Sequence, residues 1–168
     1  MLIDSHCHLD RLDLALHDGS LDAALDAARQ QGVGHFLCIG VSAENTAAVK
    51  ALAQRYENVD CSVGVHPLDL EPGAEPALGW LLQELDAPGV VAIGETGLDY
   101  HYEPEAAELQ QQSFRLHLDA ARICGKPVIV HTRAARADTL ALVREASLPQ
   151  GGVLHCFTED GDMAKNGL

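Results

Sequence analysis

Apolar runs that alternate with helical patterns constrain the fold of this chain more than any other feature of its sequence. The runs are typical of strands buried on both faces, and the segments between them carry apolar residues at three- and four-residue spacing. Such an alternation is typical of a parallel sheet covered by helices. The expected strands lie at about residues 2–3, 35–41, 59–65, 90–93, 127–130 and 152–154.

The expected helices begin at recognisable start signals. Ser20 and Ser42 suit N-cap positions, because their hydroxyls can accept hydrogen bonds from the free N–H groups of a first turn. Pro104 suits the first turn of the longest helix, where the missing N–H is not needed. Helices are expected at about residues 20–31, 78–85, 103–125 and 134–146, with one more starting at Ser42 and another after residue 162.

Polar residues of the types that bind metals follow four of the expected strands. In a closed (β/α)8 barrel the carboxyl ends of the strands converge on one mouth, where the active sites of such barrels lie. In an open doubly wound sheet they would spread along an edge. We therefore predict an α/β fold, a (β/α)8 TIM barrel with about six strand–helix units, in a single domain spanning residues 1–168 that is incomplete at its carboxyl end. The strand-end residues are His6, His8, Glu95, His131 and His155.

These residues suit a metal site that performs hydrolysis. His6 and His8 are two positions apart at a strand end, so their side chains share one face and can hold one ion together. Two surface histidines are the alternative for this pair taken alone. Four histidines and Glu95 suit zinc, manganese or iron, and a bridging carboxylate allows two ions. Paired ions can hold the attacking and leaving oxygens of a phosphoester, so hydrolysis is the expected reaction.

The phase of the strands supports convergence of these residues on one site. Each ligand on a later strand is expected to share its face with apolar residues that lie two or four positions earlier, forming a packed layer beneath the site. The expected pairs are Glu95 with Ile93 and Val91, His131 with Ile129, and His155 with Val153.

The composition of the chain indicates in which cellular compartment it works and which partners it can bind. No signal peptide is recognisable, and no apolar stretch reaches the ~20 residues of a membrane span, so no membrane association is expected. Five widely spaced cysteines without a C-x-x-C pair favour a reduced, cytoplasmic compartment. The formal charge of −14 argues against binding a polyanion by charge alone. A nucleic-acid substrate would therefore need metal ions and local arginines.

Four motifs occur in order: His6-Cys7-His8, the run from Gly94 to Tyr100, Val130-His131-Thr132-Arg133, and His155-Cys156-Phe157-Thr158. Together they resemble the TatD-type deoxyribonucleases, a metal-dependent branch of the amidohydrolase-like barrels, and the resemblance covers essentially the whole chain. It implies a hydrolase that cleaves phosphodiesters in DNA as an exonuclease, using two divalent ions (magnesium, manganese or zinc). Matched by position, His6 and His8 would hold one ion, Glu95 would bridge as the catalytic carboxylate, and His131 and His155 would hold the other.

Two departures from the family pattern are visible. The family's barrel continues to the eight units of a closed barrel, and its last strand supplies a metal-binding aspartate that this chain does not reach. A poor catalyst is the expected consequence. The second departure is Glu159, which stands where the family usually has glycine, and only a change in one loop is expected there.

Four further residues are candidates for binding the substrate: His66, Asp99, Tyr100 and Arg133. His66 lies at a strand end before Pro67. Asp99 and Tyr100 are expected in the loop after Glu95, where a plain turn role is the alternative. Arg133 lies two positions beyond His131, where its forked donors suit a phosphate. A solvated loop arginine is the alternative. Burial, rather than ligation, is expected for His117, Cys7 and Cys156.

Other functions fit the same residues. The barrel and metals are compatible with hydrolysis of a small phosphoester or a cyclic amide, and the acidic surface favours such a substrate. A third possibility is an inactive metal-binding remnant. DNA is the expected partner, with RNA as an open alternative, and the oligomeric state is left open.

Overall fold

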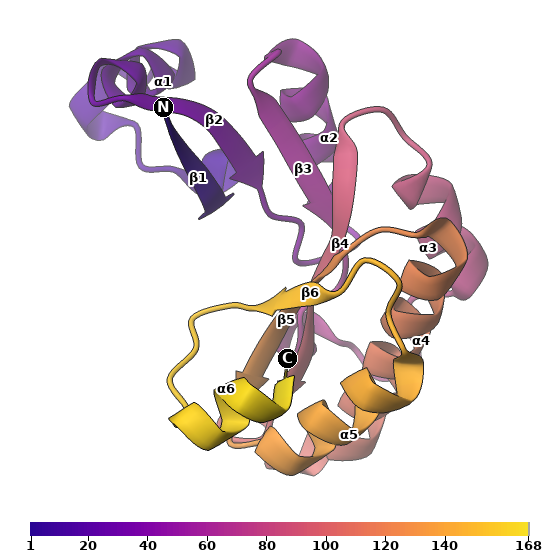
Figure 1. Cartoon of the computed structure of the whole chain (residues 1–168). Helices are drawn as coiled ribbons and strands as arrows, with labels where there is room; N and C mark the ends of the chain where they lie inside the picture. The colour runs from indigo at the N-terminus through magenta and orange to yellow at the C-terminus, as the bar shows by residue number, and fades with distance from the viewer. Residues whose placement is uncertain (168) are drawn as a thin grey trace.

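Six parallel strands form one sheet in which the spatial order is the order of the sequence. The structure, a computed structural model, describes residues 1–167. The sheet curls into a half-barrel with its helices on the outer side (Figure 1). This arrangement confirms the predicted α/β barrel fold with six strands. The strands are β1 (Leu2–Cys7), β2 (Val33–Cys38), β3 (Val59–Val63), β4 (Val90–Asp99), β5 (Val128–Arg133) and β6 (Gly152–Leu154).

The helices alternate with the strands, as the sequence pattern predicts. The Ser20 hydroxyl caps α1 by accepting a hydrogen bond from the N–H of Ala23 at 3.3 Å, and Gly125 ends α4 in the left-handed conformation. No helix within residues 1–167 is long and apolar enough to cross a membrane. The α-helices are α1 (Leu21–Gln30), α2 (Thr46–Arg55), α3 (Leu78–Leu85), α4 (Ala107–Cys124), α5 (Arg136–Ala146) and α6 (Gly161–Gly167). Short 3-10 helices are η1 (Leu9–Arg11), η2 (Ala15–His17), η3 (Pro67–Asp69) and η4 (Pro104–Ala106).

The second helix starts later than predicted. α2 begins at Thr46, and the Asn45 side chain accepts hydrogen bonds at 3.0 Å from the N–H groups of both Val41 and Ser42. The Ser42 hydroxyl accepts one from the N–H of Asn45 at 3.2 Å. These bonds organise a turn before the helix, so Ser42 stabilises the loop after β2 instead of capping α2.

Each face of the sheet packs into its own apolar cluster. We call the larger one the helix-side core, because it joins strand residues to helix residues, among them Phe36, Val130, Val49 and Phe114. The smaller one, the inner cluster, consists of Ile39, Val41, Ala92 and Ile129, none of which lies on a helix. The inner cluster supplies an apolar layer on the concave face of the half-barrel.

β4 differs from the prediction in length and in phase. It continues to Asp99 instead of ending at Ile93, so Asp99 belongs to the strand and not to the following loop. Ile93 packs into the helix-side core. The register with β5 is irregular between Ile93 and Thr96, and this irregularity changes the alternation before Glu95. The prediction that Glu95 shares its face with Ile93 is therefore wrong.

β5 keeps the predicted alternation. Ile129 belongs to the inner cluster, whereas Val128 and Val130 belong to the helix-side core. His131 therefore shares its face with Ile129, as the spacing predicts. Val153 of β6 is the register partner of Ile129, so it lies beside the same face.

The half-barrel is open between its two edge strands. Within residues 1–167, β1 pairs only with β2 and β6 pairs only with β5. Ile3 on β1 is 61% exposed and Val153 on β6 is 55% exposed. The two edge strands are therefore not paired with each other, and apolar side chains of both face solvent.

Candidate metal centre

Histidines from several strand ends surround the carboxylate of Glu95, which is only 5% exposed. Its Oε2 atom lies 3.3 Å from Nε2 of His6. Its Oε1 atom lies 3.3 Å from Nδ1 of His131 and 4.0 Å from Nε2 of His66. The two oxygens of one carboxylate therefore face different histidines, which is the arrangement that a bridging carboxylate needs.

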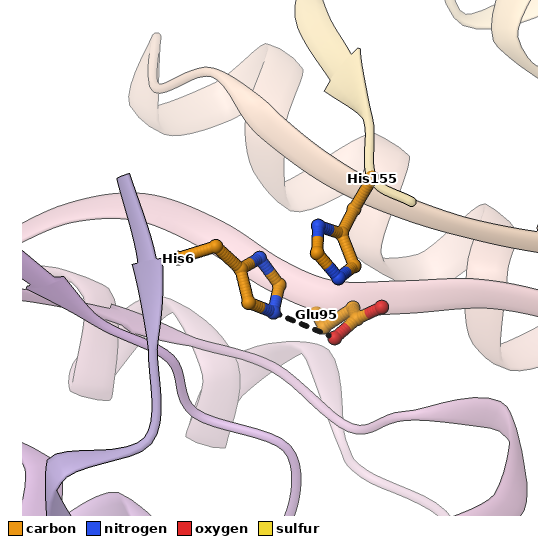
Figure 2. Close-up of side chains that lie close together, drawn as sticks. All are labelled: His6, Glu95 and His155. Carbon is orange, nitrogen blue, oxygen red and sulfur yellow. Dashed lines mark ion pairs between the residues drawn. The ribbon is translucent and has the colours of Figure 1, made fainter. Parts of the chain in front are cut away.

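Two groups of potential ligand atoms share Glu95. One group is His6, Glu95 and His155, the other is His66, Glu95 and His131, and one ligand atom per residue lies within 4.8 Å of the others in each group. In the first, the rings of His6 and His155 stack with their centroids 3.4 Å apart, and both point toward Glu95 (Figure 2). In the second, the ring centroids of His66 and His131 are 4.4 Å apart. His66, predicted as a substrate contact, thus lies among the potential ligands.

His8 lies beside the first group. Its ring centroid is 5.4 Å from that of His6, and its Nδ1 atom is buried without a hydrogen-bond partner. A buried polar nitrogen without a partner is unfavourable unless a ligand satisfies it, so His8 fits a metal ligand. The structure thus brings four of the five predicted ligands, His6, Glu95, His131 and His155, into the two groups and places His8 beside the first of them. It places His155 against His6, however, whereas the family resemblance implies that His155 shares an ion with His131.

The protonation states of Glu95, His66 and His155 suit metal binding. Burial disfavours the charge on Glu95, yet hydrogen bonds from His131 and His6 hold the pKa of its carboxyl well below the ordinary range. Burial, with the nearby His131, lowers the pKa of His66 to about 4. Burial also lowers the pKa of His155. Near pH 7 Glu95 is an anion, and His66 and His155 are neutral, as metal ligands must be.

Asp99 holds His131 in position. It ends β4 and is fully buried. Its Oδ2 atom accepts a hydrogen bond from Nε2 of His131 at 3.0 Å, and its Oδ1 atom accepts from the N–H groups of His101 and Tyr102 at 3.0 and 2.9 Å. Burial opposes the charge on His131, but Glu95 and Asp99 together raise its pKa.

These contacts correct the predicted role of Asp99. A fully buried carboxylate whose oxygens are occupied within the protein is not open to a substrate. Because Nε2 of His131 donates to Asp99, the Nδ1 atom of the same ring is left to face Glu95. This is the arrangement by which a carboxylate orients a metal-binding histidine.

Tyr100 and Arg133, both predicted to contact the substrate, have different surroundings. The Tyr100 hydroxyl donates to Asp138 at 2.8 Å and accepts from the Gln111 amide at 2.7 Å, so it ties the end of β4 to α4 and α5. Arg133 ends β5, is exposed, and places its guanidinium carbon 4.8 Å from the centroid of the Tyr102 ring. The substrate roles of both residues stay predictions.

Gln110 is a site-related residue that the sequence pattern did not reveal. It is fully buried on α4, and its amide bonds to the backbone of Asp99. The signal that could have found it is its position four residues before Phe114, on the apolar face of the helix.

The predicted burial is confirmed for His117, is partial for Cys7 and is wrong for Cys156. His117 is fully buried, and Cys7 packs against the helix-side core. Cys156 is exposed, so its predicted burial is wrong. β6 ends at Leu154 and Cys156 has a φ of 47°, so the alternation of the strand does not extend to Cys156.

Comparisons with known proteins give the same family in sequence and in structure. The pattern of the family described as TatD related DNase matches residues 3–168. The uncharacterized metal-dependent hydrolase YcfH of Escherichia coli (strain K12) is 46% identical over 165 residues, which are 97% of this chain and 61% of YcfH. The uncharacterized metal-dependent hydrolase TatD of Mycobacterium tuberculosis is 30% identical, over 98% of this chain and 64% of that protein.

A solved structure supports the same assignment. The crystal structure of YjjV, a TatD homologue from Escherichia coli K12, matches with a TM-score of 0.85 and 32% sequence identity, over 98% of this chain and 63% of YjjV. The chain therefore spans less than two thirds of the length of the relatives that it matches.

Proposed function

Because this chain belongs to the TatD-related DNase family, we propose that it is a metal-dependent hydrolase that cleaves phosphodiester bonds in DNA. The observation that carries the proposal is the Glu95 carboxylate, whose two oxygens face two separate groups of histidines. A site that can hold two neighbouring ions is typical of nucleases and phosphatases. The relatives' description as metal-dependent hydrolases supports the need for metal.

The donor set fits divalent transition metals. Neutral imidazoles with a single carboxylate suit zinc or manganese better than magnesium, which prefers oxygen ligands. When bound, such ions supply Lewis acidity toward a phosphoryl oxygen and toward water. The negative charge of Glu95, kept by the hydrogen bonds of its histidines, lies between the two groups. The residues that would hold the two ions are His6, His8 and His155 for one, His66 and His131 for the other, and Glu95 for both.

Arg133 is the proposed contact for a phosphate of the substrate. It lies two positions beyond His131 on β5, so its side chain leaves the strand on the same face. Six other arginines pair with carboxylates, whereas Arg133 makes no ion pair in the part of the chain that the structure describes. In a chain with a formal charge of −14, this guanidinium supplies the positive charge that a phosphate contact needs.

The direct test is cleavage of end-labelled single-stranded DNA by the purified chain with Mn²⁺. We expect metal-dependent shortening of the DNA that disappears with a chelator. Replacement Arg133→Gln is expected to raise KM about tenfold with little change in kcat, because one charged hydrogen bond to the substrate is lost. Metal binding without any hydrolysis would instead identify an inactive metal-binding protein.

A second substrate class is favoured by the net charge. A formal charge of −14 repels a polyanion, which fits hydrolysis of a small phosphoester or a cyclic amide at the same centre. Turnover of single-stranded DNA, RNA, bis(p-nitrophenyl) phosphate and hydantoin under the same metal separates these functions. Faster turnover of either small compound than of DNA would exclude DNA as the preferred substrate.

A further inference from the structure

Three polar side chains are buried on one face of α4: Gln110, Ser113 and His117. Gln110 and His117 are both fully buried, although the helix-side core around them is apolar. They are seven positions apart, which is about two helical turns, so they lie on the same side of the helix. Each of them bonds to the backbone of a different strand end.

Gln110 binds both backbone groups of Asp99. Its amide oxygen accepts a hydrogen bond from the Asp99 N–H at 2.7 Å, and its amide nitrogen donates to the Asp99 carbonyl at 3.0 Å. The same nitrogen donates to the Glu103 carbonyl at 3.2 Å. The carboxylate of Asp99 in turn accepts the hydrogen bond that orients His131. Gln110 on α4 therefore contacts the candidate ligand His131 indirectly, through Asp99 alone.

His117 binds the segment that carries His66. Its Nδ1 atom donates to the Ser113 carbonyl at 2.7 Å, and its Nε2 atom accepts from the N–H of Val65 at 3.0 Å. These two bonds require the neutral ring with its proton on Nδ1. Val65 directly precedes His66, whose own N–H donates to the Val41 carbonyl at 2.7 Å. The backbone at His66 is thus fixed from α4 on one side and from the loop after β2 on the other.

We propose that Gln110 and His117 are positioning residues that set His66 and His131 at the separation needed to share one ion with Glu95. This inference rests on the proposed metal-dependent function. His66 follows β3 and His131 lies on β5, and their ring centroids are 4.4 Å apart. One rigid helix holds the backbone near each of them, so the length of two helical turns determines their spacing. Apolar packing alone does not fix the position of α4 relative to the strand ends, whereas the hydrogen bonds of Gln110 and His117 to the backbone do.

The test replaces each residue by an apolar side chain of similar size, Gln110→Leu and His117→Phe. Binding of Co²⁺ to the full chain is followed by calorimetry and by the visible absorption of the bound ion. Each variant is expected to lose about tenfold in affinity for the ion held by the His66 group, the lower end of the range for residues that support metal ligands. The ion held by His6 and His155 is expected to keep its affinity.

Matched controls separate positioning from general stability. Gln112→Leu changes the same residue type on the exposed side of α4 and should alter nothing. Leu118→Ala removes a side chain from the helix-side core and should lower stability without changing Co²⁺ affinity. His117→Gln restores an acceptor for the Val65 N–H and should recover part of the lost affinity. An equal loss of affinity in Leu118→Ala would overturn the proposal.

A measurement on the metal-free protein decides the question independently of metal and of activity. The ¹⁵N chemical shifts of the His131 ring report which nitrogen carries the proton. We expect a protonated Nε2 in the wild type and a shifted Nε2 signal in Gln110→Leu, because Asp99 is then no longer held. Unchanged shifts would contradict the proposal, even if the chain binds no Co²⁺. If the variants behave as expected and no substrate is cleaved, the proposed function fails while the positioning role stands.

Discussion

Glu95 is the residue on which both ligand groups depend. It is the only carboxylate in either group, and its oxygens lie within 3.3 Å of histidines on two sides. An amide at this position keeps the shape and loses the charge. Two cations held mainly by neutral imidazoles would then be poorly neutralised. The electrostatic role of Glu95 can therefore be tested separately from its size.

We predict that Glu95→Gln lowers turnover of DNA more than His66→Ala does. Because Glu95 serves both groups, its loss is expected to exceed about 100-fold, the upper range for residues that only support metal ligands. Steady-state kinetics at saturating Mn²⁺ measures this difference. Near-normal turnover of Glu95→Gln would contradict the bridging role, and equal losses would place His66 among the essential ligands.

His117 makes stability depend on pH. Burial lowers its pKa from 6.5 to about 4. Because the pKa is lower in the folded state, the unfolded chain takes up the proton first as the pH falls. The contribution of neutral His117 to the free energy of unfolding is therefore complete above about pH 6.5 and is lost as the pH falls toward 4. The total loss is on the order of 3 kcal/mol.

This effect is measured by urea unfolding of the wild type and of His117→Phe at pH 7.5, 6.0 and 5.0. The wild type is expected to be the more stable protein at pH 7.5, and its advantage should shrink as the pH falls. Parallel pH profiles of the two proteins would show that His117 is not the titrating group.

At the scale of elements, β4 determines the geometry of the site. It carries Glu95 and Asp99, and two glycines of positive φ, Gly94 and Gly97, allow its backbone to approach β5 closely. A Cβ atom added at Gly97 would lie 2.0 Å from the carbonyl oxygen of His131. The same close approach brings the candidate ligands of the two strands together.

Gly97→Ala is expected to destabilise the protein by about 3 kcal/mol, from the steric contact with β5 and from a φ of 140° that alanine avoids. Gly79→Ala is the control, because nothing lies within 4 Å of its added Cβ and it is in α3. That change is expected to be neutral or to stabilise by up to about 1 kcal/mol. Urea unfolding gives both values, and a neutral Gly97→Ala would contradict the close approach.

At the largest scale, the sheet formed within residues 1–167 is open and has two free edges. In the part of the chain that the structure describes, Ile3 on β1 and Val153 on β6 are more than half exposed, and Val91 on β4 is 42% exposed. Full burial of such a side chain would stabilise the fold by about 1.5–3 kcal/mol. This stabilisation is lost at an exposed position, and it is large against a typical free energy of unfolding of about 5–15 kcal/mol. Unpaired strand edges also favour pairing between molecules.

We therefore predict that the purified 17.9 kDa chain is marginally stable and associates as its concentration rises. Sedimentation velocity over a range of concentrations measures the association, and Val153→Lys should reduce it by placing a charge at the β6 edge. A stable monomer at all concentrations would contradict the prediction.

The sequence by itself determined the elements and the residues at their ends. Apolar runs and helix start signals are local, so the order of strands and helices could be predicted from them, and with it the barrel-type sheet. His6, His131 and His155 could be singled out because a parallel sheet brings the carboxyl ends of its strands to one side. His117 could be predicted as buried from its place on the apolar face of a helix.

Only the tertiary structure decided how these residues are combined. The phase of β4 before Glu95 follows from an irregular register with β5, which no local pattern encodes. The stacking of His155 on His6 and the hydrogen bond from His131 to Asp99 depend on distances between segments far apart in the chain. The role of Gln110 required the same information, because a buried polar side chain is explained only by the partner that it reaches through the fold.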